Sequence, residues 1–240
     1  MSKVWIITKR ELSGFFDSLI AYVMIILFLG ITGAFTWLFG TNVFMRGQAS
    51  LDVFDYFTYL TLFFFIPAIT MRMIAEENKS GTIELLITKA ISDSQIVLGK
   101  FFACLILVAV SLAFTVSYYI TLTLLGNVDD GAVFGSYLSL ILMSASYVSI
   151  GLFASSLTQN QIVSFLLSIS ILALFHWIFG VIGREFTGPL SVLFSFLSMS
   201  THVESLSRGV IDSRDIIYFF SIMVVGLSGT QIMLSKRNWK

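Results

Sequence analysis

The sequence predicts an all-α membrane protein with six transmembrane helices, from its composition, its charge-free stretches and the distribution of its basic residues. Hydrophobic residues make up 57% of the 240 positions and charged residues only 12%, with a mean hydropathy of +0.92. A soluble fold needs more polar residues than this to cover its surface. We therefore expect lipid to be the solvent for most of the chain.

Charge and cysteine content argue against several other classes of function. Fourteen Lys and Arg balance fourteen Asp and Glu, so there is no basic excess to bind nucleic acid. The single cysteine, Cys104, cannot form an intrachain disulfide. With only His176 and His202 as histidines, the sequence offers no cluster of metal ligands. We expect neither a metal nor another cofactor in this chain.

The first expected element is an amphipathic helix that lies in the membrane interface. The alternative is a cytosolic tail that frays. Ile6 and Ile7 interrupt its polar side, and no signal-peptide cleavage site follows, so the first apolar run should remain as an anchor. The apolar side consists of Val4, Trp5, Thr8, Leu12, Phe15, Phe16 and Leu19, and the polar side of Lys3, Arg10, Ser13 and Asp17.

Charge-free stretches identify the membrane spans, because crossing a hydrocarbon core of about 30 Å takes about 20 helical residues. The stretch 131–183 is too long for one helix and is broken by the polar run 158–161, so it should hold two spans. Pro67 predicts a kink in the second span, because it removes a backbone donor. In a single domain over 1–240, the expected spans are about 18–39, 54–75, 100–125, 133–156, 162–183 and 216–235.

The stretch 186–203 is too polar for a seventh lipid-facing helix, but short re-entrant or interfacial helices tolerate such polarity. Basic residues support six spans. They divide into ten on the side of both termini and four on the other, and the positive-inside rule then places both termini in the cytoplasm. The first group is Lys3, Lys9, Arg10, Arg72, Lys79, Lys89, Lys100, Lys236, Arg237 and Lys240, and the second is Arg46, Arg184, Arg208 and Arg214.

The segment between the second and third spans carries most of the cytoplasmic charge. Gly81 permits a bend, after which Ile83, Leu86 and Ile87 fall on one face of a short amphipathic helix, with Glu84 beside them. A solvated connector would explain the lysines but not an amphipathic helix, so docking on a protein partner is the competing interpretation. A capping box, S-x-x-Q at 92–95, then predicts the start of the third transmembrane helix.

The string EENKSGTIELLITKAISDSQIVLGKF, residues 76–101, resembles the hallmark of ABC-2 type permeases. In that family two acidic residues, a glycine, Thr-Ile-Glu-Leu-Leu and a later Val-Leu-Gly-Lys surround the coupling helix. The opening stretch WIITKREL (5–12) and the stretch HVESLSRGVID (202–212) are also similar to the family, so the resemblance covers the whole chain. It is closest to the gliding-motility and copper-processing branch.

This resemblance implies a six-helix permease subunit that dimerises with itself or with a related permease. Its coupling helix would dock on a separate ABC ATPase subunit, which binds the ATP. It further implies a multi-pass protein of the bacterial inner membrane, in contact with lipid and with a periplasmic or auxiliary membrane protein as a further candidate partner. The residues expected to contact the ATPase, here called the coupling segment (76–87), are Glu76, Glu77, Gly81, Thr82, Ile83, Glu84, Leu86 and Ile87.

Two other interpretations, an ATP-binding site and an intramembrane protease, have less support from the sequence than the permease. A phosphate-binding loop around Gly99-Lys100 would need glycine at 94 and Ser or Thr at 101, where the chain has Ser94 and Phe101, so we expect no ATP-binding motif. The run 226–229, with His176, resembles the G-x-S-G serine and the histidine of rhomboid-like intramembrane proteases. The order of the two residues is reversed here, and small residues at a helix-packing face explain the run better.

His176 is the only ionisable residue well inside an expected span, and it is a candidate functional residue. The alternative is a neutral imidazole bonded to a neighbouring helix. The spans otherwise contain few polar groups and no charge pairs, which argues against a small-ion pathway. A lipid-like or amphiphilic substrate, or transmission of force to periplasmic partners, fits an apolar interior better. A non-transporting anchor of a motility or secretion machine would share every motif named.

Overall fold

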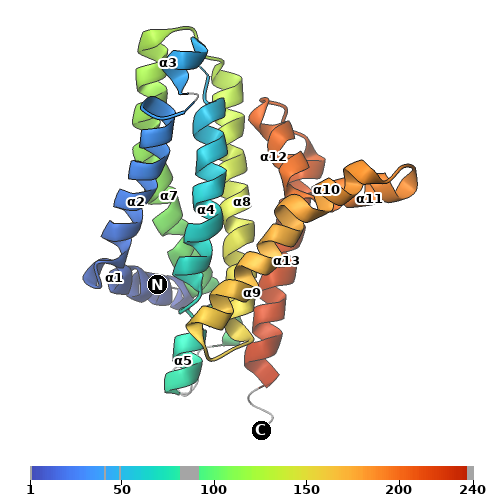
Figure 1. The fold of residues 1–240 in the computed structure, drawn as a ribbon. Helices are drawn as coiled ribbons and strands as arrows, with labels where there is room; N and C mark the ends of the chain where they lie inside the picture. Colours follow the sequence, from blue (N-terminus) through green and yellow to red (C-terminus); the bar gives the residue numbers. More distant parts are fainter. Residues whose placement is uncertain (1, 41, 49, 82–91, 237–240) are drawn as a thin grey trace.

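The computed structural model describes residues 2–40, 42–48, 50–81 and 92–236, and all regular elements in these ranges are helices (Figure 1). Within them six helices are long and apolar enough to cross a membrane, which confirms the predicted all-α membrane fold. Four of them are single helices: α2 (Ile20–Trp37), α7 (Asp93–Leu125), α8 (Asp130–Ser156) and α13 (Ser213–Ser235). The second span, Asp52–Ser80, consists of α4 (Asp52–Thr70) and α5 (Ala75–Ser80). The fifth, Gln161–Glu185, consists of α9 (Gln161–Ala173), a π-helix η1 (Leu174–Ile178) and α10 (Phe179–Glu185).

Side-chain caps fix where several of these helices begin. The backbone N–H of Ser92 donates to the Gln95 side chain at 3.3 Å, in the predicted capping box at the start of α7. The side chains of Asp129, Asn160 and Asp212 accept from the first turns of α8, α9 and α13. The starts of these four spans are therefore defined by local hydrogen bonds.

Helix α8 is the centre of the bundle, with α4, α7, α9, α12 and α13 packed around it. In its most apolar stretch 78% of the residues are buried, against 22% in α2 at the periphery. Serines at the helix contacts let the neighbours approach closely: an added Cβ at Gly226 of α13 would lie 2.7 Å from the Ser149 hydroxyl oxygen. The fully buried serines of α8 are Ser136, Ser139, Ser144, Ser146, Ser149 and Ser155.

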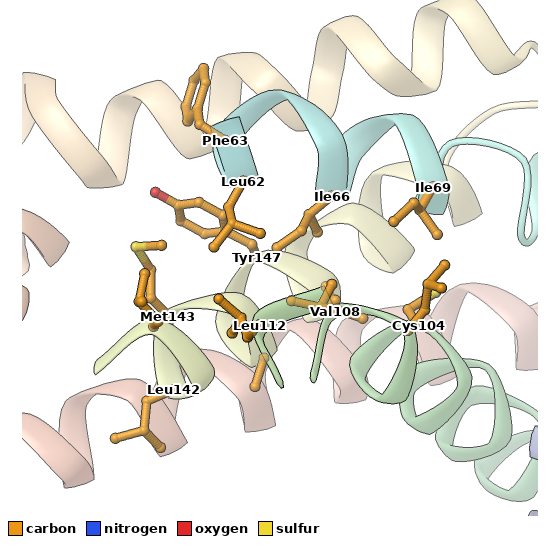
Figure 2. Close-up of a cluster of buried hydrophobic side chains, with 14 of the residues drawn as sticks. Leu62, Phe63, Ile66, Ile69, Cys104, Val108, Leu112, Leu142, Met143 and Tyr147 are labelled. Atoms are coloured by element: carbon orange, nitrogen blue, oxygen red, sulfur yellow. The ribbon is translucent and has the colours of Figure 1, made fainter. Parts of the chain in front are cut away.

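An apolar core fills the space where α4, α7 and α8 meet (Figure 2). Ile66 of α4, Cys104 and Val108 of α7, and Tyr147 of α8 are among its buried side chains. The free thiol of Cys104 is part of this core, as expected for a small apolar residue.

The second span is divided in two. Helix α4 runs through Pro67 and ends at Thr70, and α5 begins at Ala75. The Ser155 hydroxyl oxygen of α8 accepts from the backbone N–H groups of Ile74 and Ala75, at 3.1 and 3.0 Å. The backbone groups left free by the interruption are thus bonded to the central helix.

Helix α1 (Lys3–Asp17) packs against α7. Thr8 and Phe15 of the predicted apolar side are buried, and all four residues of the predicted polar side are exposed. Ile7, which the sequence places on the polar side, is buried against Gly99, where an added Cβ would lie 2.6 Å from its Cγ2 atom. The Thr8 hydroxyl also donates to the Gly99 carbonyl at 3.2 Å. Trp5 and Leu19 of the predicted apolar side are 45% and 69% exposed. The contact with α7 thus includes Ile7 in addition to the predicted apolar side, and contact of this helix with lipid stays a prediction.

Helix α1, α5 and the C-terminal end of α13 lie at one end of the bundle, and α3 (Val43–Arg46) and α12 (Met199–Ser207) lie toward the other (Figure 1). Helix α11 (Pro189–Leu197) turns back along α10, and the pair projects sideways from the bundle. Helices α11 and α12 are the short helices predicted before the last span. At the α8–α12 contact, an added Cβ on Gly135 would overlap the carbonyl oxygen of Leu206.

Candidate functional site

A cluster of charged residues around a buried lysine, here called the Lys100 cluster (Arg10, Glu11, Glu77 and Lys100), joins three helices at the end of the bundle that holds α1 and α5. Lys100, in the second turn of α7, is only 1% exposed. Its ammonium nitrogen lies 2.8 Å from a carboxylate oxygen of Glu77 on α5 and 3.3 Å from one of Glu11 on α1. Arg10 pairs with both of these glutamates. Two acids and two bases therefore neutralise one another within the protein.

The cluster also fixes the charge state of Glu11, which lies in α1, outside the spans. Burial raises the pKa of this carboxyl, but the nearby Lys100 and Arg10 outweigh burial and bring the pKa below its ordinary value of 4.5. Glu11 is therefore ionised at neutral pH. A buried lysine with ionised partners on two other helices holds the three helices in register.

The predicted coupling segment begins beside this cluster. A cavity of about 380 Å³ is lined by α1, α5 and α7, and Glu76, Glu77, Arg72 and Lys100 are among its lining residues. Gly81 follows α5 with a φ of +72°, in the left-handed region that favours glycine, as the predicted bend requires. Thr82, Ile83, Glu84, Leu86 and Ile87 lie outside the described residues, so their contacts stay a prediction.

Comparison with known proteins agrees with these features. The family described as "ABC-2 family transporter protein" matches residues 5–210, which include α1, the Lys100 cluster and the coupling segment. The chain belongs to the ABC-2 transporter family. It is thus a transporter permease subunit of the membrane, and the specific branch predicted above is not distinguished by this match. Among curated proteins, none matches the sequence.

In this ABC-2 permease, His176 lies on the π-helix η1 and is buried. Its Nδ1 atom is 2.7 Å from the hydroxyl oxygen of Tyr147 on α8, the bond to a neighbouring helix that the sequence left as an alternative. Ser228, the serine of the protease interpretation, is exposed on α13 and donates to the carbonyl of Val225 in its own helix. The described residues thus place His176 with Tyr147 and Ser228 with its own backbone.

A second buried pair, which the sequence did not indicate, connects α12 to α13 in the permease. The Nδ1 atom of His202 lies 2.6 Å from Oδ1 of Asp215, and its Nε2 atom lies 2.8 Å from the carbonyl oxygen of Phe196. The imidazole is stacked on the ring of Tyr218, with centroids 4.0 Å apart. Because every polar atom of this imidazole is bonded, the pair fastens α12 to the last span.

The expected spans of this permease contain more buried polar groups than the sequence indicated, and an ion-pair cluster lies at the edge of one of them, with Glu11 and Glu77 outside the expected spans. Lys100 of α7 is buried in ion pairs, the central helix carries buried serines, and Asp55 of α4 is a buried carboxylate. A charge-free stretch in the sequence ends at a charged residue, but it does not tell whether that residue faces water or a neighbouring helix. The only sequence signals were Lys100 at the edge of an apolar run and Asp55 inside the expected span 54–75.

Proposed function

We propose that this permease couples ATP hydrolysis by a separate nucleotide-binding subunit to export, or to conformational work, across the membrane. The Lys100 cluster is the observation that carries the proposal. The coupling segment starts in α5 and leads along the chain into α7, and Glu77 of α5 and Lys100 of α7 are paired at 2.8 Å. Helix α5, in which the segment starts, is therefore fastened to α7 and, through Lys100 and Glu11, to α1.

This arrangement converts a push on the coupling segment into movement of helices. Pulling Glu77 away from Lys100 would leave this buried lysine with Glu11 as its remaining partner, and losing one partner of a buried ion pair is unfavourable. Helices α5 and α7 therefore move together, rather than separating when the ATPase subunits close. Helix α7 packs on α8, the centre of the bundle, so the displacement reaches the other spans. A packed bundle responds by changing between discrete arrangements, such as inward- and outward-facing states.

The assembly that we propose contains two permease subunits, identical or related, and two ATPase subunits. Six spans are half of the usual transporter complement, and closed two-fold assemblies are the commonest oligomers. The fifth span supports a further contact in the membrane, because only 17% of its most apolar stretch is buried within one subunit. In this assembly both termini face the cytoplasm of a bacterial cell. Mass measurement of the solubilised complex should give this stoichiometry, and a lone monomer without ATPase would contradict it.

The coupling segment provides the decisive experiment. Replacing Ile83 and Leu86 together with serine removes two apolar side chains, each of which stabilises a docked helix by about 1.5–3 kcal/mol. We expect the double variant to insert normally in the membrane and to lose co-purification with the ATPase. The matched control is the double serine replacement of Phe44 and Met45, two exposed apolar residues of α3 toward the other end.

Normal binding and coupling in the Ile83 and Leu86 variant would show that this helix is not the docking element. A Gly81→Val variant tests the same point by blocking the left-handed turn. Measuring flux of a lipid-like or amphiphilic substrate separates a transporter from the second candidate, a non-transporting anchor of a motility or secretion machine. A serine-reactive probe on Ser228 tests the protease interpretation.

A further inference from the structure

A second cavity, of about 420 Å³, lies toward the opposite end of the bundle between α4, η1 and α12. It falls within the range of small-molecule sites, about 300–1,000 Å³. Its lining combines carboxylates with aromatic rings and includes neither a lysine nor an arginine. The carboxylates are Asp52, Asp55 and Glu204, and the rings include Tyr56, Tyr59 and Trp177.

Asp55 differs from the other two acids because it has no cationic partner among the described residues. Asp52 lies 3.6 Å from Arg46, and Glu204 pairs with Arg208. Asp55 is 7% exposed, and its Oδ2 atom accepts from the Ser136 hydroxyl at 2.6 Å. Its Oδ1 atom is buried without a hydrogen-bond partner in the described part of the chain. A buried carboxylate in this state is costly unless a cation or a donor meets it.

The surroundings of Asp55 decide which ligand could meet it. Aromatic faces attract ammonium groups, most strongly when water is excluded, and the rings of Tyr59 and Trp177 line the same cavity. An anionic head group would face the carboxylate of Asp55, while the nearby Arg46 and Arg208 are already paired with Asp52 and Glu204. A neutral head group could offer Asp55 only a hydrogen bond, whereas an ammonium group also offers the opposite charge. His176 lines the cavity as well, but its Nδ1 atom is already bonded to Tyr147.

We propose, resting on the permease function above, that this cavity binds the ammonium head of a cationic amphiphile and that Asp55 is its counter-ion. The ammonium pairs with the carboxylate of Asp55 and lies beside the aromatic rings. The apolar tail leaves the cavity toward lipid. The substrate class of the permease is then an amine-bearing or quaternary-ammonium amphiphile.

Trp177 provides a reporter inside the cavity. The full-length chain, with Trp5, Trp37 and Trp239 replaced by phenylalanine, is held in dodecyl maltoside micelles, which contain no ammonium group, and its fluorescence is titrated with octyltrimethylammonium. We expect a saturable change in Trp177 emission. In the Asp55→Asn variant, the half-saturating concentration should rise at least tenfold. Octanol and octanoate, with the same chain length and neutral or anionic heads, should give no saturable change.

The matched control is Asp130→Asn, which removes an exposed acid at the start of α8 that does not line the cavity. It should shift the half-saturating concentration by less than twofold. An unchanged titration in Asp55→Asn, or an equal saturable response to octanol, would overturn the counter-ion role of Asp55. Absence of any saturable response in the parent protein would overturn the cavity as an ammonium site.

A second measurement avoids substitution at Asp55, in case that variant fails to insert. A hydrophobic carbodiimide modifies buried carboxyls, and mass spectrometry reports the modified fraction of Asp55 in the unsubstituted chain. Octyltrimethylammonium should reduce that fraction at least fivefold and octanoate should not, whereas equal labelling with and without the cation would contradict binding. Because no ATPase is present in either assay, this site and the coupling function can fail independently.

Discussion

The two ends of the bundle each hold a buried ionisable residue, and the two residues differ in their partners. Lys100 is compensated by the carboxylates of Glu11 and Glu77, each from a different helix. Asp55 has one hydroxyl donor, from Ser136, and no cation among the residues described. The first arrangement fastens helices together, because separating them leaves a charge alone. The second leaves a charge for something outside the chain to neutralise, as a binding site requires.

The largest expected effect concerns topology: the two ends of the bundle should lie on opposite sides of the membrane. Single cysteines are introduced at exposed positions on a Cys104→Ala background, and intact cells are treated with an impermeant thiol reagent. Cysteines near the Asp55 end should react completely and those near the Lys100 end should not, as the excess of basic residues beside the termini requires. The reverse pattern would invert the orientation. The first group is Gln48, Asp130 and Ser213, and the second is Lys79 and Lys236.

The next largest effect concerns how much the ion pairs of Lys100 stabilise the folded protein. Lys100→Met should lower the free energy of unfolding by about 3–5 kcal/mol, because Glu11 and Glu77 would remain as neighbouring acids without their buried cation. Thermal unfolding of the solubilised permease measures the loss. Adding Glu11→Gln and Glu77→Gln to the same variant should recover most of it. A single variant as stable as the parent would show that the cluster does not fasten the helices.

At the other end the same measurement should give the contrasting result. Asp55→Asn keeps an acceptor for the Ser136 hydroxyl and removes a charge that has no cation in the described structure. We expect the free energy of unfolding to stay equal or to rise, against the loss of about 3–5 kcal/mol at Lys100. A similar loss at both positions would mean that Asp55, too, is compensated within the protein.

The smallest effect is a dependence of stability on pH. The pKa of Glu11 is lowered in the folded protein, so its contribution is complete above the ordinary value of 4.5 and is lost as the pH falls through the folded value. This contribution should be about 1 kcal/mol or less, since Glu11 is partly exposed. Unfolding midpoints measured from pH 7 down to pH 3 should fall less steeply in Glu11→Gln. Parallel curves would contradict the lowered pKa.

The sequence was sufficient for features that depend on neighbours along the chain. Span lengths follow from charge-free runs, and the cap at Ser92 depends only on Gln95, three residues away. Burial of Ile7 could not be predicted, because it depends on the space left by Gly99, 92 positions later. The same reason hid the partners of Lys100, which are Glu77 and Glu11 at 23 and 89 positions away, and the Ser136 donor of Asp55, 81 positions away.

The central helix α8 has a consequence for how the protein is made. Its serines Ser146 and Ser149 donate to the carbonyls of Phe219 and Ile222 in α13, at 3.3 and 3.5 Å. Helix α13 leaves the ribosome after the other five described spans, so until then part of the packing surface of α8 faces lipid or an insertion factor. A chain truncated before 213 should insert five spans and still be recognised by membrane proteases as unfinished. Packing around α8 is thus completed only after α13 has been inserted.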